Sequence, residues 1–249
     1  MYFNNAQCDI YIGTGAGKKL MEEIAAASNS VKIVSPFLSA KLVQGLIELQ
    51  EGGVHVELIT TEPERGKSGL LGALIRQHVH MDQRAQHRKR VLHRILKICY
   101  FLVGLGVLAL WFFFAQQAVL PVLYILATIG IFGLAVLILH HVLKRVRVFS
   151  YSYEPIFPIR MIKPSDAFGK RTTYLHSKIY IIDDRIAYMG SLNFTYSGTE
   201  SNYETRVRLT DAPSVKKIVQ EFHYLMDEAD FPELDICRWG SRLYHEPFH

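Results

Sequence analysis

A run of 42 residues, from Ile98 to Leu139, contains no Asp, Glu, Lys, Arg or His. A helix rises about 1.5 Å per residue, so about 20 apolar residues cross the roughly 30 Å hydrocarbon core of a bilayer. The run is therefore long enough to cross twice. Polar residues at Gln116 and Gln117 suit a tight turn between the two crossings. The run predicts a transmembrane hairpin with helices over about 96–115 and 119–141.

Two further patterns fit such a hairpin. Trp111 and Tyr124 lie near the predicted turn, where amphipathic aromatic rings suit a membrane interface. Glycines occur on both predicted helices and are expected to permit their close approach: Gly104, Gly106, Gly130 and Gly133.

Basic residues flank the uncharged run on both sides, whereas the predicted turn carries no charge. By the positive-inside rule, both flanks, both termini and the remaining chain are predicted to face the cytoplasm. The alternative, a helical hairpin buried in a soluble protein, is disfavoured by two uncharged spans with basic collars. These collars are Arg84, Arg88, Lys89, Arg90, Arg94 and Lys97 before the first span, and Lys144, Arg145 and Arg147 after the second.

Charge and cysteine content indicate which partners and which cellular compartment to expect. The net charge of +5 and the isoelectric point near 9.0 point weakly to anionic partners. The three cysteines, Cys8, Cys99 and Cys237, have neither disulfide-framework nor zinc-site spacing, which favours a reducing compartment. The first residues lack a basic segment followed by an apolar one, so no signal peptide is expected.

The segment before the hairpin alternates between strand and helix patterns. Strands are predicted over 9–13, 31–35 and 54–60, with helices over 18–27 and 39–50, the latter beginning at a potential cap, Ser39. This rhythm is typical of a sheet covered by helices. The stretch from about Gly66 to the first span is predicted to be one long helix.

After the hairpin, strands are predicted over 146–152, 156–162, 173–183, 186–189 and 204–210, and an amphipathic helix over 213–228. Neither half alone has enough elements for a domain. We therefore predict one α/β domain, a mixed sheet flanked by helices, interrupted by the two-helix hairpin. Its parts are 1–94 with a membrane-proximal helix, the hairpin at 95–143, and 144–249.

A cluster of polar residues in the second half suits phosphate chemistry. His176 and Lys178 are two apart, so on a strand they share a face. The next strand brings back Ser191 and Asn193 as donors, beside the positive charge of Lys178. Asp183 falls on the opposite face and is expected to fix the turn. Glu204 is available to accept from the second ring nitrogen of His176 and so orient it.

These residues resemble the signature of the phospholipase D superfamily, H-x-K-x4-D followed by six residues and G-S-x-N. Here it runs from His176 through Asp183 to Gly190-Ser191-Leu192-Asn193, with no departure from the pattern, and Glu204 lies where the family places its histidine-orienting acid. The likeness extends loosely over the first half, including Ser35-Pro36-Phe37-Leu38-Ser39. The alternative, a surface histidine and lysine on an exposed strand, does not account for the fixed spacings.

The resemblance implies a two-step phosphodiesterase without metal or cofactor. One histidine attacks phosphorus to form a phosphohistidine, a second protonates the leaving alcohol, and water then releases the phosphoryl group. The family uses two motifs per active site, whereas this chain has one. A homodimer with two copies of His176 facing across a twofold axis is therefore expected.

Other features are less specific. The segment 13–18 lacks phosphate-loop spacing and is interpreted as a glycine-rich turn. His78 with His80, and His140 with His141, lack partner ligands and are interpreted as polar collar residues. The basic run from Arg84 to Lys97 suits anionic headgroups, and less well RNA or DNA. Trp239, Tyr244 and Phe248 either pack or touch the membrane.

Three functions remain open. Membrane tethering favours a phospholipid substrate such as cardiolipin or phosphatidylglycerol. Single-motif dimers and the positive charge favour a metal-independent endonuclease. A catalytically silent membrane scaffold is the third, and the intact set of His176, Lys178, Asn193 and Glu204 argues against it.

Overall fold

The structure is a computed structural model that describes residues 6–61, 68–115, 119–163, 175–229, 231 and 233–247. The chain divides into two compact units. The first contains Met1–Gln77 and Tyr153–His245, and the second contains His78–Ser152 and Glu246–His249. The first unit is thus built from two segments that are distant in sequence.

The first unit is organised around an eight-stranded mixed sheet. In spatial order its strands are β1 (Cys8–Thr14), β9 (Tyr203–Leu209), β8 (Ile186–Gly190), β7 (Ile179–Ile182), β2 (Ser30–Val34), β3 (His55–Thr61), β6 (Ile159–Ile162) and β10 (Glu233–Leu234). The strands β2, β3 and β6 are parallel, and the other neighbours are antiparallel. Both halves of the chain contribute strands to this one sheet, with β2 and β3 of the first half between β7 and β6 of the second, which confirms the predicted single α/β fold.

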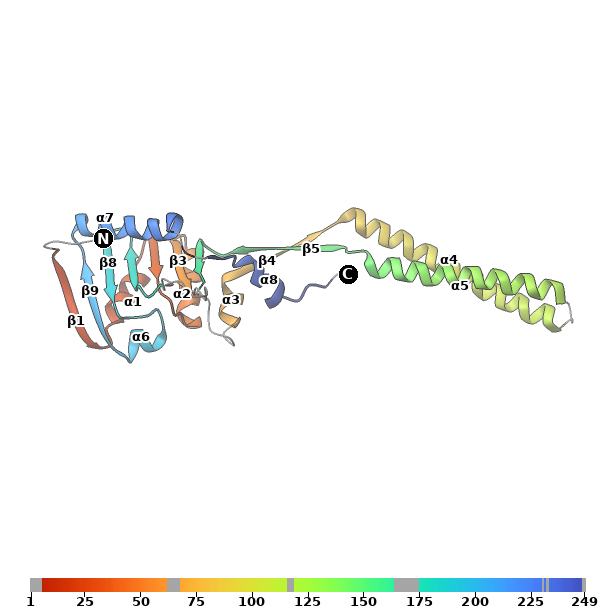
Figure 1. Ribbon diagram of the computed structural model, residues 1–249, viewed down its shortest axis with the longest axis horizontal. Coiled ribbons are helices and arrows are strands. Elements are labelled where there is room, and N and C mark those ends of the chain that lie inside the picture. The colour runs from red at the N-terminus through yellow and green to blue at the C-terminus, as the bar shows by residue number, and fades with distance from the viewer. Residues whose placement is uncertain are drawn as a thin grey trace, which may run out of the picture. The chain divides into compact units, whose positions relative to one another are not determined.

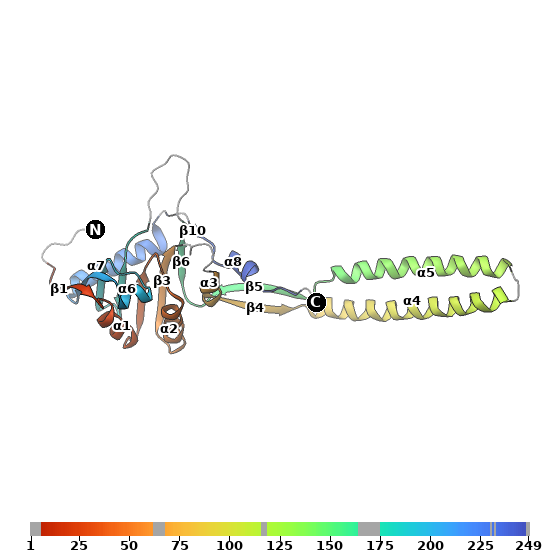
Figure 2. The same cartoon turned by 90° about the horizontal axis from the view of Figure 1, so that it is seen from below.

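Helices cover both faces of the sheet (Figure 1). On one face lie α1 (Lys18–Ala25) and α2 (Ala40–Glu51), which pack with α3 (Ser68–Leu74) and α8 (Cys237–Leu243) around one apolar core. On the other face α7 (Ala212–His223) and a following π-helical turn (Tyr224–Glu228) enclose a second core around Phe222. Figure 2 shows α1 and α2 in front of the sheet and α7 behind it.

Local sequence explains where several helices begin. Asp211 caps α7 by accepting a hydrogen bond from the Ser214 amide at 3.1 Å, and Pro213 lies in the first turn. Ser39 occupies the N-cap of α2 with extended backbone, although its side chain makes no capping bond. Trp239 and Tyr244 pack against the α1/α2 core, so these two tail residues contribute to packing; Phe248 lies outside the described residues.

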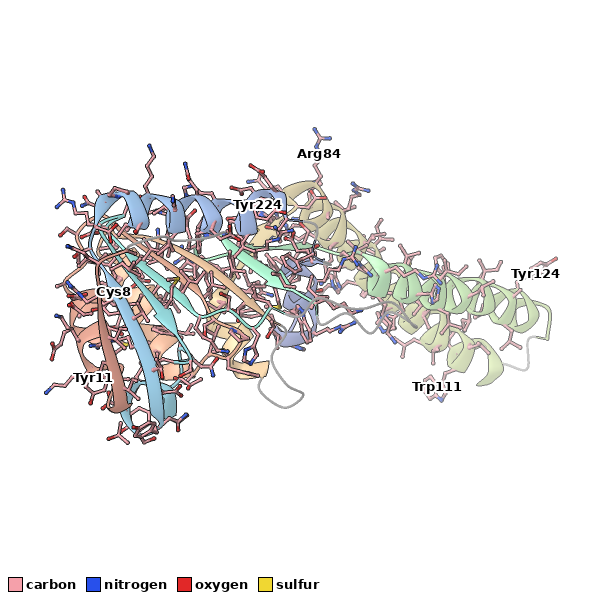
Figure 3. All side chains as sticks on the ribbon, turned by 60° about the vertical axis from the view of Figure 1, so that its left-hand side comes forward. Cys8, Tyr11, Arg84, Trp111, Tyr124 and Tyr224 are labelled. Carbon is pink, nitrogen blue, oxygen red and sulfur yellow. The ribbon has the colours of Figure 1, made fainter. Side chains whose placement is uncertain are left out.

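The second unit contains the two long apolar helices, α4 (Gln83–Ala115) and α5 (Val119–Arg145). They lie side by side in Figure 2 and share a small core of Leu96, Cys99, Val136 and Leu143. Both are long and apolar enough to cross a membrane, with a mean hydropathy of 2.2, and only 11% and 6% of their most apolar windows are buried. Trp111 and Tyr124 project outward from them (Figure 3). The turn predicted at Gln116 and Gln117 lies outside the described residues.

The predicted long helix from Gly66 to the membrane is wrong. After α3 the chain forms β4 (Ile75–Met81), which pairs with β5 (Phe149–Pro155). β-branched residues at Ile75 and Val79 favour the extended form, and the partner strand is rich in aromatic residues. A contact of 2.8 Å between His80 Nε2 and Ser152 Oγ links the two strands.

The predicted role of the helix glycines holds for one of the four. A Cβ added to Gly106 would lie 3.0 Å from Ile129, so this glycine does permit close approach of the two helices. A Cβ added to Gly104, Gly130 or Gly133 would meet no atom within 4 Å. The side chains of the shared core, such as Leu96 and Leu143, also contribute to the contact between α4 and α5.

Candidate active site

The strand register brings the predicted site residues to one end of the sheet. Val34 at the end of β2 pairs with Ile179 at the start of β7, which pairs in turn with Met189 near the end of β8. Gly190 then pairs with Arg206 near the start of β9. The residues that flank these positions, Lys178, Ser191 and Glu204, are therefore gathered at a single edge although 26 residues separate the first from the last.

His176 and Lys178 are in direct contact. Lys178 Nζ lies 2.9 Å from His176 Nδ1 and donates to the His176 carbonyl oxygen at 2.7 Å. The regular strand β7 begins only at Ile179, so the pair belongs to the segment before it and not to the strand interior that the alternation predicted. The two side chains nevertheless face each other, because the lysine folds back onto the histidine.

The two groups differ in exposure. Lys178 is 5% exposed, whereas the His176 side chain is exposed and open to an incoming group. Burial lowers the pKa of Lys178, and the negative charge of Glu204 partly opposes this effect. The same ammonium also lies 3.3 Å from Nε2, so it is within hydrogen-bonding distance of both ring nitrogens. The pair therefore combines an exposed nitrogen base with a cation held close beside it.

Glu204 is buried but does not contact His176 in this chain. One carboxylate oxygen accepts from Ser191 Oγ, and the other accepts from Asn202 Nδ2 at 3.1 Å. Ser191 Oγ in turn accepts from the Thr205 amide at 3.0 Å. The hydrogen bond expected between Glu204 and His176 is absent from the contacts of the described residues; the acid instead accepts from Ser191 and Asn202.

Asn193 is positioned through its two neighbours. The Tyr180 hydroxyl donates to the Leu192 carbonyl at 2.7 Å, and the buried Ser35 hydroxyl accepts from the Phe194 amide at 2.9 Å. The Asn193 Oδ1 atom is buried, and no partner for it lies among the described residues. Its backbone is therefore fixed while its side-chain amide retains hydrogen-bonding capacity at the edge of the site.

Asp183 has a structural position. Its carboxylate accepts from the backbone amides of Ser28, Asn29 and Ser30, at 2.7 Å for Asn29 and 2.9 Å for Ser30. Burial raises the pKa of Asp183, but these amide bonds outweigh it and hold the pKa below its ordinary value. Asp183 and Asp184 both have positive φ, and the Arg185 amide donates to the Ile182 carbonyl at 3.0 Å, so the three-residue loop between the paired residues Ile182 and Ile186 contains a type I′ turn. The carboxylate thus ties the β7–β8 turn to the start of β2.

The glycines near the site serve close packing. A Cβ on Gly190 would lie 2.0 Å from the Thr205 carbonyl oxygen, so the G-S-x-N segment needs a glycine where β8 meets β9. A Cβ on Gly17 would lie 2.4 Å from Thr199 Cα, because the start of α1 packs on α6 (Tyr196–Glu200). Within the described ranges, no three His, Cys, Asp or Glu side chains gather as metal ligands.

Sequence reasoning identified the side chains of the motif but missed their supports. The sequence pattern places Ser35 at a strand end and assigns no role to Tyr180 or Asn202. Each acts through a hydrogen bond to a backbone group or to Glu204. A buried hydroxyl residue at the end of an apolar strand, as at Ser35, is the available sequence signal.

Comparisons with known proteins agree with this geometry. Residues 146–226 match the family described as "Cardiolipin synthase, PLD-like domain". The mitochondrial cardiolipin hydrolase of Xenopus tropicalis is 33% identical over 108 residues, which cover 41% of this chain and 51% of that protein. Cardiolipin synthase 2 of Bacillus anthracis is 27% identical over 99 residues, covering 40% of this chain and 19% of that protein.

The structural comparison gives a weaker likeness. NucT from Helicobacter pylori aligns over 91% of this chain and 98% of its own, with 14% identity and a TM-score of 0.49. The present chain spans about half the length of the cardiolipin hydrolase and less than a fifth of the cardiolipin synthase.

Proposed function

Since residues 146–226 belong to the phospholipase D-like domain family, we propose that this protein is a membrane-anchored phosphodiesterase that hydrolyses phospholipid through a phosphohistidine intermediate. The observation that carries the proposal is the contact between exposed His176 and buried Lys178, at the sheet edge that also holds Ser191 and Asn193. A nitrogen nucleophile beside a fixed cation and free amide is the arrangement that phosphoryl transfer requires.

The chemistry proceeds in two balanced steps. A ring nitrogen of His176 attacks phosphorus, the bond from phosphorus to the leaving alcohol oxygen breaks, and His176 of the partner subunit protonates that oxygen. Water then attacks the phosphohistidine, gives its proton to the same partner histidine, and the phosphorus–nitrogen bond breaks. Lys178 and Asn193 from both subunits stabilise the charge on the phosphoryl oxygens. Glu204 lies close enough to affect the pKa of Lys178. It is proposed to orient the histidine after it gives up one of its hydrogen bonds, to Ser191 or to Asn202.

The lipid substrate is favoured by the two apolar helices. Their low burial means that most of their apolar side chains have no protein partner, as expected for a surface that faces lipid. Basic residues at the start of α4 and the end of α5 suit anionic headgroups on the cytoplasmic side. Tethering by this hairpin keeps the catalytic unit at a membrane, where phospholipid is abundant.

A metal-independent endonuclease is the second candidate, and one observation favours it. Exposed aromatic side chains lie near the catalytic edge: Phe37 after β2, Tyr196 at the start of α6 and Tyr203 at the start of β9. Exposed rings of this kind stack on bases of single-stranded nucleic acid.

The deciding experiment offers purified full-length protein cardiolipin, phosphatidylglycerol, single-stranded DNA and RNA in the presence of EDTA. Hydrolysis of lipid that is lost in His176→Ala and retained in His55→Ala, a matched exposed histidine at the opposite end of the sheet, supports the proposal. Cleavage of nucleic acid alone establishes the second candidate. Hydrolysis that needs a divalent ion contradicts the mechanism.

The shared site has its own test. Wild-type and His176→Ala subunits are co-expressed and mixed in known proportions. If two histidines serve one phosphate, only dimers with two wild-type subunits are active, and an equal mixture retains about a quarter of the activity. Independent protomers would retain about half, and that result would exclude the shared site.

A further inference from the structure

An apolar groove runs along the face of the sheet that carries α1 and α2. Its volume is about 770 Å³, within the range of sites that hold small organic ligands. Its lining includes Met21 and Ile24 of α1, Leu42, Gly45 and Leu49 of α2, and Phe194. Several of these side chains are only partly buried, so the groove is open to an incoming chain.

One end of this groove adjoins the candidate active site. Phe194 follows Asn193 directly, and its carbonyl oxygen accepts from the Ser39 amide at 3.1 Å, just before α2 begins. From there the groove follows α2 to Gly52 and Val54, over a length of about 17 Å. The apolar lining therefore leads away from the segment that carries Asn193.

The charged residues that line the groove distinguish a nucleic-acid ligand from a lipid ligand. The polar lining residues are Lys41, Gln44 and Glu48. Lys41 is exposed at the catalytic end, where its ammonium lies 5.7 Å from the centre of the Tyr196 ring. A nucleic-acid backbone needs cations along its whole path. A single cation at the catalytic end, followed by an apolar channel, is instead complementary to a phosphate attached to a hydrocarbon chain.

We propose, resting on the phosphodiesterase function above, that this groove holds one acyl chain of the phospholipid substrate. Raising a phospholipid headgroup to a catalytic edge draws the nearest methylene groups out of the bilayer. Exposure of each methylene to water lowers the population of the raised state about fourfold. Covering these groups in the groove removes that penalty, so the groove determines how well long-chain substrates reach His176.

Gly45→Trp tests the groove directly. Gly45 lines the groove and a Cβ added to it meets no atom within 4 Å, so an indole at this position is expected to occupy the groove. Gly72→Trp is the matched control, because Gly72 is also a helical glycine with open space at its Cβ and it lies outside the groove lining. Both variants are compared with wild type by thermal unfolding and by hydrolysis of a long-chain and a freely soluble short-chain form of one phospholipid.

The expected result for Gly45→Trp is a loss of at least about tenfold in kcat/KM for the long-chain substrate, with the short-chain value within about twofold of wild type. Gly72→Trp should change neither value. An equal loss for both substrates, or no loss for either, would overturn the proposal.

A second measurement does not depend on turnover. A phospholipid with a photoreactive group on its acyl chain is bound to His176→Ala protein and illuminated. Labelling of the α2 peptide that contains Leu42 and Leu49, reduced by Gly45→Trp, supports the acyl site. Labelling confined to other segments overturns it. If wild type hydrolyses no phospholipid but the groove is labelled, the proposed lipid hydrolysis fails while the binding site stands.

Discussion

The Asp183 carboxylate is predicted to stabilise the fold and to take no part in catalysis. Asp183→Asn keeps one acceptor oxygen and tolerates the positive φ of this position, so it removes mainly the negative charge. A hydrogen bond to a charged acceptor exceeds a neutral one by about 1 kcal/mol. The hydrogen bond from the Ser30 amide is partly buried, and we assign it the whole of this difference. The bonds from the Ser28 and Asn29 amides are exposed to solvent, so we assign each of them about half of it.

The expected loss of stability is therefore about 2 kcal/mol, which lowers the Tm by about 4–8 °C for a domain of this size. The pH dependence supplies a second check. Because the folded-state pKa of Asp183 is lowered, its contribution is complete above the unfolded-state pKa and is lost as the pH falls through the folded-state value. The Tm difference between wild type and Asp183→Asn should persist from pH 7 to about pH 4 and narrow below it.

The assay is thermal unfolding of full-length protein in detergent, monitored by near-ultraviolet circular dichroism, together with hydrolysis at a temperature where both forms are folded. Asp9→Asn is the control, because Asp9 is an exposed acid whose contact with Arg208, at 3.3 Å, is a surface ion pair. Its Tm should change by less than about 2 °C. An unchanged Tm for Asp183→Asn with activity reduced a hundredfold or more would refute the structural role.

Three other experiments, which use four substitutions, give sharp expectations. Gly190→Ala should cost more than about 3 kcal/mol, because its Cβ would collide with the Thr205 carbonyl oxygen, and a normal Tm would contradict the packing described. Ser191→Ala should cost about 1–3 kcal/mol, because one oxygen of buried Glu204 loses its donor; unfolding in urea measures this, and no change in midpoint would mean that the acid is solvated. In a cysteine-free background, Gln117→Cys should react with an impermeant maleimide from the non-cytoplasmic side and Lys217→Cys only after permeabilisation; the reverse pattern would invert the proposed topology.

Most of the sheet was predictable because its strands are short apolar runs bounded by turn residues. The run from Val31 to Val34 and that from Ile179 to Ile182 are buried on both faces, and such strands have a strong sequence signal. The strand β4 was missed because its histidines adjoin a basic helical stretch, and its partner β5 lies far along the sequence. The two-residue strand β10 has no periodicity at all.

The site was predictable at the level of its motif but not of its hydrogen bonds. Spacing alone indicates that His176 and Lys178 lie together, because two residues apart remain near in any extended backbone. It carries no information on which oxygen Glu204 offers to which donor. That choice depends on Ser191, which follows β8, and on Asn202, which precedes β9. Which donors reach the Glu204 carboxylate is therefore decided only when the strands have assembled into the sheet.

The first unit holds together the two chain segments between which the hairpin lies. The chain leaves this unit at Gln77 and re-enters at Tyr153, and the Gln77 side-chain amide donates to the Tyr153 hydroxyl at 3.2 Å. The ring of Tyr153 packs on Tyr244, whose hydroxyl lies 2.6 Å from the carbonyl oxygen of Ile75. Exit and return are thus held together by contacts within the α/β unit itself. Because the entropic cost of a closed loop grows only slowly with its length, a long insertion here costs the sheet little. We infer that the apolar hairpin is accommodated at this position because contacts within the α/β unit already hold the two chain segments together there.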